Sequence, residues 1–458
     1  MSPLHDTIAA ISTPLGEGGL AVVRLSGPGA LKIADACFTP LGKVSRQPSG
    51  APTHTIHYGK IVRRGAPVDE VLLAVLRAPR TYTREDMVEI SCHGGLLPAK
   101  SVLDTVLENG ARLAEPGEFT KRAFLNGRID LTQAEAVADL IHSRTGLAMQ
   151  AANEQLAGKL AQRINQLRDE MVKTLAHIEA HIDFPDEDIA PDIKDQLLKR
   201  LESAVAFTDQ LLRTANEGQI LRRGIRAAIV GRPNVGKSSL LNQLLGRDRA
   251  IVSPIAGTTR DTIEETTNIR GLPIVFIDTA GLRQAGDVIE EEGIRRSRET
   301  VAKAELILQV FDVSEALTPE DEAYLAEFAG KKRILVRNKT DLANRLNLPP
   351  DSAAPIVGVC CVTGQGLEQL KDAIKEIVWA GEIRAEMLEV MINSRHQDAL
   401  QRARAATLRT IDALRGDLTL ELVAMDLRIA TNAVGEIVGK TTTEDLLDSI
   451  FSQFCIGK

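Results

Sequence analysis

The stretch Gly231-Arg232-Pro233-Asn234-Val235-Gly236-Lys237-Ser238-Ser239 decides the fold of the central part of the chain. It fits the phosphate-binding pattern GxxxxGK[ST] and lies between an apolar run at residues 225–230 and a helical pattern that follows. Its glycines let successive N–H groups point at phosphate oxygens, and the helix N-terminus adds a positive dipole. Lys237 supplies a charge to the outer phosphates, and Ser238 offers a hydroxyl to Mg²⁺. The order strand, loop, helix favours a nucleotide-binding loop over a chance glycine turn.

Around this loop, short apolar runs alternate with helical patterns, which is typical of a doubly wound α/β sheet. A turn at Gly271-Leu272-Pro273 is expected to join two neighbouring strands as a hairpin. The sequence therefore predicts a nucleotide module over residues 223–380. Its expected strands cover residues 225–230, 262–269, 273–277, 306–311, 333–336 and 355–359.

The stretch Asn338-Lys339-Thr340-Asp341 follows an apolar run and predicts which base is bound. The carboxylate of Asp341 can accept hydrogen bonds from both N1–H and the 2-amino group of guanine. Adenine lacks this pair of donors and would leave the carboxylate desolvated and unpaired. Asn338 can hold the loop, and the stem of Lys339 can cover the face of the base. We therefore expect GTP rather than ATP.

Two further stretches occupy the positions of nucleotide-sensing segments. Asp278-Thr279-Ala280-Gly281 directly follows a strand, so that Asp278 can reach Mg²⁺ through water and the Gly281 N–H can reach the γ-phosphate. Thr258-Thr259-Arg260-Asp261 lies between the first helix and the next strand. We expect Thr259 to complete the Mg²⁺ ligands when the γ-phosphate is present.

Two departures from a Ras-type enzyme predict how GTP is hydrolysed. Leu282 stands where such enzymes have a water-orienting glutamine, and leucine cannot orient water. The acidic run Glu290-Glu291-Glu292 can supply that group, or it is simply a solvated helix start. Asn234 can coordinate a monovalent cation beside the phosphates, in the place of an arginine finger. We expect hydrolysis to require K⁺.

The parts that flank the module differ from it in composition. Residues 1–120 mix strand-like runs with turns and two helical patterns, which predicts an α+β domain. Residues 121–222 and 381–458 have helical periodicity, so the Ras-like GTPase domain at 223–380 is expected to be inserted in one helical domain. The sequence thus predicts a multidomain protein with α/β and α+β parts.

Polar residues outside the module are candidates for a second site. Arg24 lies within an apolar strand-like run, and Glu89 alternates with apolar neighbours. They can line a small-molecule pocket, or form a salt bridge or a solvated strand face. Cys455, fourth from the C-terminus, is either a thiol delivered to a site elsewhere or a small buried hydrophobe.

Composition limits the choice of function. The net charge of −7 gives no signature of nucleic-acid binding, and 3% aromatic residues leave few platforms for stacking on single-stranded RNA. The five cysteines form no CxxC pair, so a zinc ribbon or a dithiol redox motif is not indicated. Since neither a signal-peptide pattern nor an apolar run of ~20 residues is present, we expect a cytoplasmic protein without membrane contact.

Motifs along the whole chain resemble those of the MnmE (TrmE) tRNA modification GTPases. The nucleotide module is the central part of this resemblance. The other stretches are Asp6-Thr7-Ile8-Ala9-Ala10, residues 18–27, Glu115-Pro116-Gly117-Glu118-Phe119-Thr120-Lys121-Arg122-Ala123-Phe124-Leu125-Asn126-Gly127, residues 131–141, Asp183-Phe184-Pro185-Asp186-Glu187 and the terminal Phe454-Cys455-Ile456-Gly457-Lys458.

The resemblance implies an N-terminal domain that binds a tetrahydrofolate one-carbon donor, in its 5-formyl or 5,10-methylene form, and forms a homodimer. The family often has lysine where Arg128 stands. Cys455 would lie near the folate pocket as a candidate for the chemistry, and Glu290 falls at the family's water-activating glutamate. The positions that resemble the family's folate contacts are Arg24, Glu89, Arg128 and Lys458.

The resemblance also implies the ligands of GTP and K⁺. With Lys237 and Glu290 as the catalytic residues of hydrolysis, K⁺ would be held by Asn234, Ser253, Ile255 and Thr258, and would bring two nucleotide modules face to face. The remaining GTP-binding positions are Val235, Gly236, Ser238, Ser239, Pro254, Ala256, Gly257, Thr259, Asp278, Thr279, Ala280, Gly281, Asn338, Lys339 and Asp341.

Family members work with a flavin-dependent partner that carries FAD. Together they add a carboxymethylaminomethyl or aminomethyl group at C5 of the wobble uridine, position 34, of certain tRNAs. The resemblance thus implies tRNA and that partner, in a heterotetramer. In one departure, Cys360-Cys361-Val362 replaces the family's guanine-supporting Ser-Ala-Arg/Lys loop. The alternative is a GTP-dependent assembly factor or scaffold, for example in ribosome maturation, which would require neither the folate-like domain nor the terminal cysteine.

Overall fold

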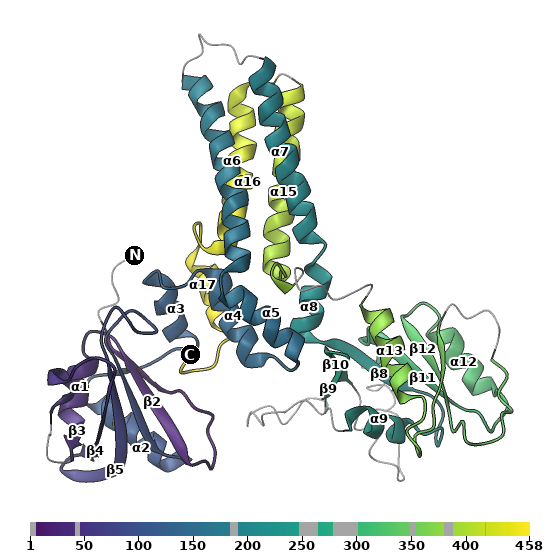
Figure 1. Ribbon diagram of the computed structural model, residues 1–458, viewed down its shortest axis with the longest axis horizontal. Helices are drawn as coiled ribbons and strands as arrows, with labels where there is room; N and C mark the ends of the chain where they lie inside the picture. Colours follow the sequence, from purple (N-terminus) through teal and green to yellow (C-terminus); the bar gives the residue numbers. More distant parts are fainter. Residues whose placement is uncertain are drawn as a thin grey trace. The chain divides into compact units, whose positions relative to one another are not determined.

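The computed structural model describes residues 6–41, 46–183, 191–246, 264–277, 301–348, 354–379, 388–416 and 418–458 (Figure 1). The chain divides into two compact units. The first comprises Met1–Ala138 with Thr431–Lys458, and the second comprises Asp139–Ala430. Within the described residues, no helix is both long and apolar enough to cross a membrane.

The first unit is built on a seven-stranded sheet with the order β3-β4-β5-β6-β2-β1-β7. Neighbouring strands are antiparallel except for β1 and β7, which pair in parallel. The strands are β1 (Ile8–Ile11), β2 (Leu20–Ser26), β3 (Phe38–Pro40), β4 (Thr55–Arg63), β5 (Ala66–Leu76), β6 (Met87–His93) and β7 (Arg112–Leu113).

The two faces of this sheet have different neighbours. Helices α1 (Ala30–Cys37) and α2 (Leu96–Glu108) bury one face in a core that includes Val23 and Ile90. On the other face, α3 (Glu118–Leu125) covers the end near β1 through a small cluster around Phe119. Among the described residues, no helix covers the rest of that face, and its exposed apolar side chains are Leu20, Ile56, Tyr58 and Leu72.

The C-terminal segment belongs to the same unit. Helix α17 (Glu444–Phe451) packs with α3 and with α4 (Leu131–His142) around Phe451 and Phe454. The chain then reaches the sheet region, where Ile456 forms an isolated bridge with Pro116. The two ends of the sequence therefore meet within one unit.

The second unit contains a six-stranded sheet with the order β13-β12-β11-β8-β10-β9. All pairs are parallel except β9 with β10, a hairpin whose turn residues Arg270 and Gly271 both have positive φ. The predicted turn was one residue too late, because Leu272 already belongs to β10. The elements are β8 (Ile225–Val230), α9 (Lys237–Leu245), β9 (Glu265–Ile269), β10 (Leu272–Phe276), β11 (Leu306–Asp312), α12 (Pro319–Glu327), β12 (Arg333–Asn338), β13 (Ile356–Gly358) and α13 (Leu367–Val378).

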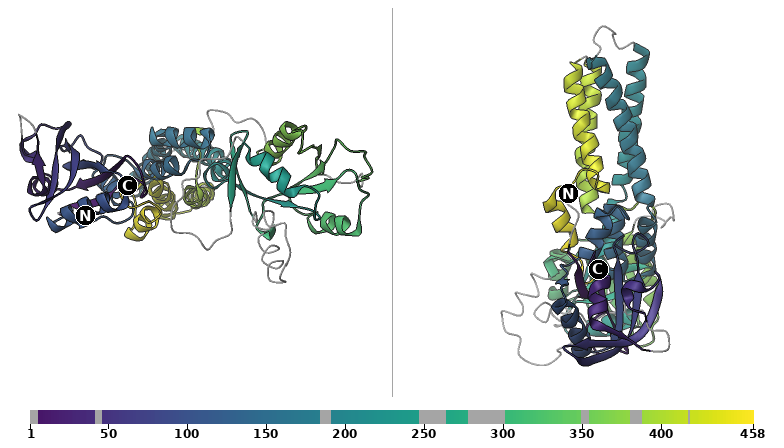
Figure 2. Two further views of the ribbon diagram at one scale, coloured as in Figure 1. Left: turned by 90° about the horizontal axis from the view of Figure 1, so that it is seen from below. Right: turned by 90° about the vertical axis from the view of Figure 1, so that its left-hand side faces the viewer.

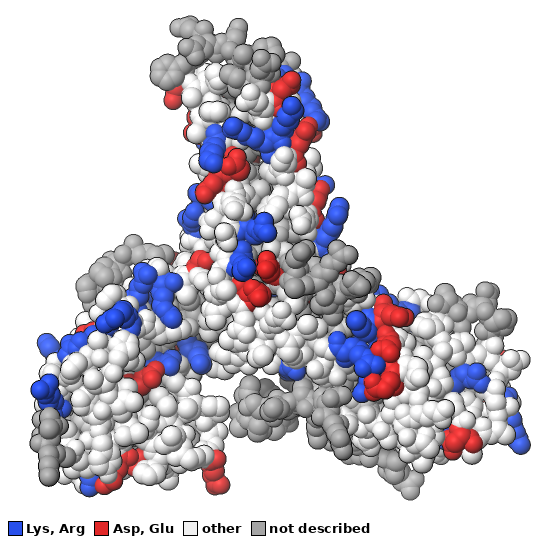
Figure 3. All heavy atoms as spheres, viewed as in Figure 1, with Lys and Arg blue, Asp and Glu red and all other residues white. Residues whose placement is uncertain are grey.

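Long helices that precede and follow the nucleotide module in the sequence pack together. Helices α6 (Lys159–Asp183), α7 (Pro191–Leu212), α15 (Ser394–Arg415) and α16 (Leu420–Val438) lie side by side in all three views (Figures 1 and 2). Positive and negative side chains intersperse on the exposed side of these helices (Figure 3). Ion pairs such as Arg404–Asp209 and Arg428–Glu179 join neighbouring helices.

The nucleotide sheet shares its core with two short helices of this bundle. Ala148 and Ala151 of α5 (Gly146–Leu156) and Leu221 of α8 (Ala215–Arg223) belong to the same buried cluster as the strands. Helices α5 and α6 are separate, because the chain turns at Gly158, where φ is +85°. The predicted fold class, a P-loop α/β module combined with helical and α+β parts, is confirmed.

Candidate functional sites

The phosphate loop connects β8 to α9 with a geometry that only glycine permits at two positions. Gly231 and Gly236 have φ of +145° and +99°. A Cβ at Gly231 would lie 2.4 Å from the Val310 oxygen, and one at Gly236 would lie 2.1 Å from Nδ2 of Asn338. The loop is therefore a cradle of backbone N–H groups without room for a side chain at these two positions.

The ammonium group of Lys237 folds back over this loop. Its Nζ donates to the carbonyl oxygens of Gly231 and Arg232 at 2.7 and 2.6 Å. Burial lowers the pKa of Lys237, and the charge of Glu320 only opposes that change. A desolvated cation with neutral partners is suited to receive phosphate oxygens. The neighbouring Ser238, for which a Mg²⁺ role was predicted, lies in the first turn of α9.

Asn338 joins the phosphate loop to the loops expected to hold the base. The side chain is buried, its Nδ2 donates to the Val235 oxygen at 2.8 Å, and its Oδ1 accepts from the Cys361 N–H at 3.3 Å. Lys339 has φ of +63°, and its Nζ lies 2.5 Å from Oδ2 of Asp312. The side chain that was expected to cover the base therefore has an ionic anchor in β11.

Asp341, the residue expected to select guanine, is exposed at the same edge. Its Oδ1 accepts a hydrogen bond from the thiol of Cys360 at 3.1 Å. Asn234 has φ of +64°, a left-handed conformation that asparagine tolerates better than most residues, and it is exposed in the phosphate loop. These residues from separate turns gather around one end of the sheet.

Part of the predicted nucleotide site lies outside the described residues. The segments concerned are those expected to sense the γ-phosphate, to complete the K⁺ and Mg²⁺ ligands and to orient water. The residues are Ser253, Pro254, Ile255, Ala256, Gly257, Thr258, Thr259, Asp278, Thr279, Ala280, Gly281 and Glu290.

The second candidate site is in the first unit, where Arg24 and Glu89 are direct cross-strand partners on β2 and β6. Arg24 Nε lies 2.9 Å from Oε1 of Glu89, with side-chain exposures of 18% and 31%. The salt bridge that the sequence allowed is therefore present. This ion pair lies at the edge of the area that α3 covers, because the Arg24 guanidinium is 5.7 Å from the ring centroid of Phe119 in that helix.

The C-terminal tail attaches beside this pair. The Gly457 oxygen accepts from Ser12 Oγ at 3.1 Å and from Arg24 Nη1 at 3.5 Å. Gly457 has φ of +94°, and a Cβ there would lie 2.5 Å from the Ile11 oxygen. Glycine is therefore required for the tail to approach β1 so closely.

The tail brings Lys458 and Cys455 to the same region. Burial lowers the pKa of Lys458, the charge of Arg24 lowers it further, and interactions with Cys455 and Glu89 oppose the change. Cys455 is exposed. The alternative that it is a buried hydrophobe is therefore wrong, because the short tail places its side chain on the surface.

Sequence reasoning missed Tyr82, which contacts two of the predicted residues. The guanidinium carbons of Arg24 and Arg128 lie 5.9 and 4.7 Å from the centroid of the Tyr82 ring. Arg128 Nη1 also donates to the backbone oxygen of Tyr82 at 3.1 Å, and the Tyr82 hydroxyl lies 2.9 Å from Oγ1 of Thr120. A tyrosine in a turn-rich stretch, one of only three in the chain, was the available signal. We call Arg24, Tyr82, Glu89, Arg128 and Lys458 the Tyr82 cluster.

A buried ionic network supports the helix beside this cluster. The fully buried Arg122 of α3 contacts Asp6 Oδ1 at 2.7 Å, Glu118 Oε1 at 2.9 Å and Glu85 Oε2 at 3.3 Å. Burial acts to raise the pKa of Glu118, but hydrogen bonds from Arg112 and Arg122 outweigh it and hold that pKa below its usual value. The network ties α3 to the segment that carries Tyr82.

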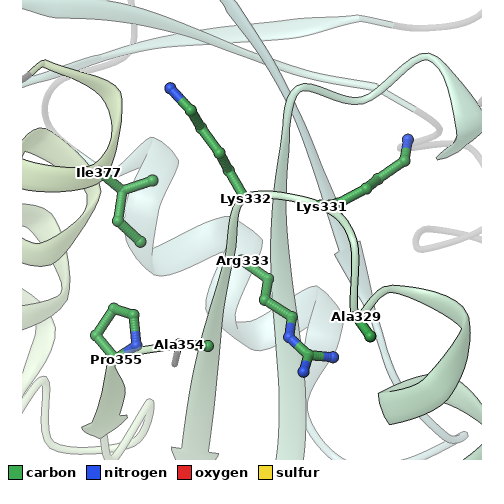
Figure 4. A pocket seen from close by; sticks show the side chains of 7 residues that line it. All are labelled: Ala329, Lys331, Lys332, Arg333, Ala354, Pro355 and Ile377. Atoms are coloured by element: carbon green, nitrogen blue, oxygen red, sulfur yellow. The ribbon is translucent and has the colours of Figure 1, made fainter. Parts of the chain in front are cut away.

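Cavities also lie elsewhere among the described residues. One of about 160 Å³ is lined by Ile11, Leu15 and Leu20 of the first unit. Another, of about 500 Å³, has the cations Lys331, Lys332 and Arg333 on its wall (Figure 4). Lys331 donates to three carbonyl oxygens, and Arg333 donates to the Leu325 oxygen at 2.6 Å. Two of these cations already donate to backbone oxygens, so we assign no ligand to this cavity.

Comparison with known proteins shows the family to which this chain belongs. Residues 7–128 match the family model described as GTP-binding protein TrmE N-terminus, and residues 131–455 match that of the MnmE helical domain. A tRNA modification GTPase MnmE from Geobacillus kaustophilus (strain HTA426) is 49% identical over 461 residues, which cover 99% of both chains. The chain belongs to the MnmE family. A protein of the same description from Bacillus subtilis (strain 168) is 46% identical over 461 residues, 99% of this chain and 100% of its own.

Family membership establishes the general activity of the protein. This MnmE-family protein is a GTP hydrolase that acts in tRNA modification, as the sequence predicted, and the family implies the use of Mg²⁺ with the nucleotide. Among solved structures, the G domain of the T. maritima FeoB iron transporter covers 33% of this chain and 98% of its own, with 31% identity and a TM-score of 0.26.

Proposed function

We propose that this protein is a K⁺-stimulated GTPase that acts with a flavin-dependent partner to install a carboxymethylaminomethyl or aminomethyl group at C5 of uridine 34 in certain tRNAs. The one-carbon unit comes from a tetrahydrofolate. The observation that carries the proposal is the Tyr82 cluster, which gathers four predicted ligand residues beside the exposed Cys455, in a different unit from the phosphate loop.

The chemistry of the Tyr82 cluster suits a folate. Its three cations, Arg24, Arg128 and Lys458, match the carboxylates of a glutamyl tail, and the carboxylate of Glu89 matches the paired N–H donors of a pterin. The ring of Tyr82 adds an aromatic surface for a planar ligand. Arg128 in the place of the family's lysine keeps the charge and adds a planar fork for a carboxylate. The thiol of Cys455 is the candidate nucleophile at this site.

In the nucleotide site, we propose that Asp341 selects guanine and that Lys237 neutralises charge on the transferred phosphoryl group. Asn234 supports the K⁺ requirement, because it is an exposed amide residue of the phosphate loop whose oxygen can serve as a cation ligand. Glu290 is the proposed water-orienting residue. Hydrolysis at equal rates in Na⁺ and K⁺ buffers would contradict the role of Asn234. Loss of GTP binding, rather than of hydrolysis, in Glu290→Ala would contradict the role of Glu290.

The uncovered sheet face supports the proposed homodimer. Ile56 lies in the same cross-strand row as Ala74, Glu89 and Arg24, so an apolar patch adjoins the Tyr82 cluster. A sheet is normally buried on its apolar face by a second layer, and a second copy would provide one. Sedimentation of Ile56→Glu should then show a weaker dimer, whereas an unchanged dimer would place the interface elsewhere.

The deciding experiment is mass analysis of tRNA nucleosides from cells with and without this protein, together with binding of 5-formyltetrahydrofolate to the full chain. We expect the C5-modified uridine to disappear without the protein, and the folate to bind with a loss on Glu89→Ala. If the amount of the C5-modified uridine is the same with and without the protein, and no folate binds, a GTP-dependent scaffold would be favoured instead.

A further inference from the structure

We propose that Cys360 is a positioning residue that orients the carboxylate of Asp341 and so sets the preference for guanine. This inference rests on the proposed role of Asp341. The thiol of Cys360 donates to Asp341 Oδ1 at 3.1 Å. Cys360 is fully buried whereas Asp341 is exposed, so the contact joins a fixed donor to a surface carboxylate.

The donor is held by the turn that precedes α13. The Cys360 N–H donates to the Gln365 oxygen at 2.9 Å, and the Cys360 oxygen accepts from the Gly364 N–H at 2.8 Å. Gly366 closes this turn with φ of +80°, and a Cβ there would lie 2.0 Å from the Gly358 oxygen. Both backbone groups of Cys360 are therefore engaged, and its thiol has a defined place.

The acceptor, Asp341, belongs to a turn that is attached to the residue before Cys360. The Thr340 N–H donates to the Val359 oxygen at 3.2 Å, immediately before Cys360. The backbone around Asp341 is thus fixed, but an exposed carboxylate still rotates about its side-chain bonds. Guanine requires both carboxylate oxygens to face N1–H and the 2-amino group together. A hydrogen bond to one oxygen limits that rotation before the base arrives.

The adjacent cysteine has a different role. The Cys361 N–H donates to Asn338, its oxygen accepts from Gln243 Nε2 at 2.7 Å, and its side chain belongs to the apolar core. Burial, and then the neighbouring Cys360, raises the pKa of the Cys361 thiol to about 11. Of the two thiols, only that of Cys360 reaches the carboxylate, so Cys361→Ala is a matched control for the loss of a buried thiol.

The test measures the dissociation constants of GTP and ITP for the full chain. Cys360→Ala should weaken GTP binding about three- to tenfold, the effect of one hydrogen bond, and raise KM with little change in kcat. ITP, which lacks the 2-amino group, should lose less, so the GTP-to-ITP preference falls. Cys360→Ser should remain within about twofold of the wild type, because the hydroxyl is again a donor.

A double-mutant cycle with Asp341→Ala separates orientation from packing. If Cys360 acts through the carboxylate, Cys360→Ala should cause no further loss once Asp341 is alanine, and Cys361→Ala should leave the GTP-to-ITP preference at its wild-type value. Equal losses for GTP and ITP, or a Cys360→Ser variant as weak as Cys360→Ala, would overturn the inference. Unchanged GTP binding in Asp341→Ala alone would instead overturn the proposed role of Asp341.

Discussion

The phosphate loop takes its geometry from a strand, a turn and a helix that follow one another in the sequence, whereas the Tyr82 cluster draws its side chains from distant segments. In the first case, backbone conformation creates the site, as the positive φ of Gly231 and Gly236 shows. In the second case, cross-strand register and the attachment of the C-terminal tail create it. The first site should therefore depend on local residues, and the second on the tertiary contacts that bring its parts together.

The largest expected effect concerns Lys237. Lys237→Ala should reduce kcat for GTP hydrolysis about 10³-fold, because the cradle loses the ammonium that contacts the transferred phosphoryl group. Phosphate release measures this, and binding of 5-formyltetrahydrofolate should not change. Lys331→Ala is the control, since that ammonium caps backbone carbonyls and should affect stability alone. Near-normal hydrolysis by Lys237→Ala would disprove the role given to the loop.

The next effect concerns Arg122, on which the first unit depends. Arg122→Met should lower the free energy of unfolding of that unit by about 3–5 kcal/mol, because Glu85 loses its ion pair with Arg122 and the buried Glu118 keeps only its contact with Arg112. The neighbouring Lys121→Met removes an exposed ion pair with Asp448 and should cost less than about 1 kcal/mol. Circular dichroism in denaturant follows both units, and the fluorescence of Trp379, the only tryptophan, follows the second. An equal cost for both variants would contradict the importance of the network.

A smaller effect is expected at Tyr82. Tyr82→Leu should weaken binding of 5-formyltetrahydrofolate about tenfold, because two guanidinium groups lose the ring that holds them. Tyr82→Phe should bind within about threefold of the wild type, since the ring remains and only the contact to Thr120 is lost. GTP hydrolysis in K⁺ reports whether the second unit is intact. Equal binding by the leucine and phenylalanine variants would show that the ring has no positioning role.

The smallest effect is a pH dependence of the first unit. The pKa of Glu118 is lowered on folding, so the unfolded chain binds more protons in acid. Its contribution to stability is complete above its ordinary value of 4.5 and is lost as the pH falls through the lower folded value. The slope should reach at most about 1.4 kcal/mol per pH unit for this carboxyl and should flatten in Glu118→Gln. Stability that rises on acidification would contradict this sign.

The comparison of the two regions also shows which elements a sequence can predict. Strand β8 has the predicted bounds, because a continuous apolar run is a local signal. Strand β4 was missed, since its first four residues alternate between half-buried and exposed and it contains Gly59. A sheet face with exposed apolar residues gives no clean apolar pattern. Tyr82 was missed because its importance comes from Arg24 and Arg128, which are near it only in space.

The sequence by itself determined the phosphate loop, the doubly wound module and the Asn338–Asp341 motif that predicts GTP, because these rest on consecutive residues whose pattern is local. It also carried the resemblance that family membership confirmed. The tertiary structure alone decided that Arg24 pairs with Glu89, that Gly457 attaches the tail to β1, and that the Cys360 thiol meets Asp341. These contacts depend on strand register and on close approaches between distant segments, which no periodicity in the chain encodes.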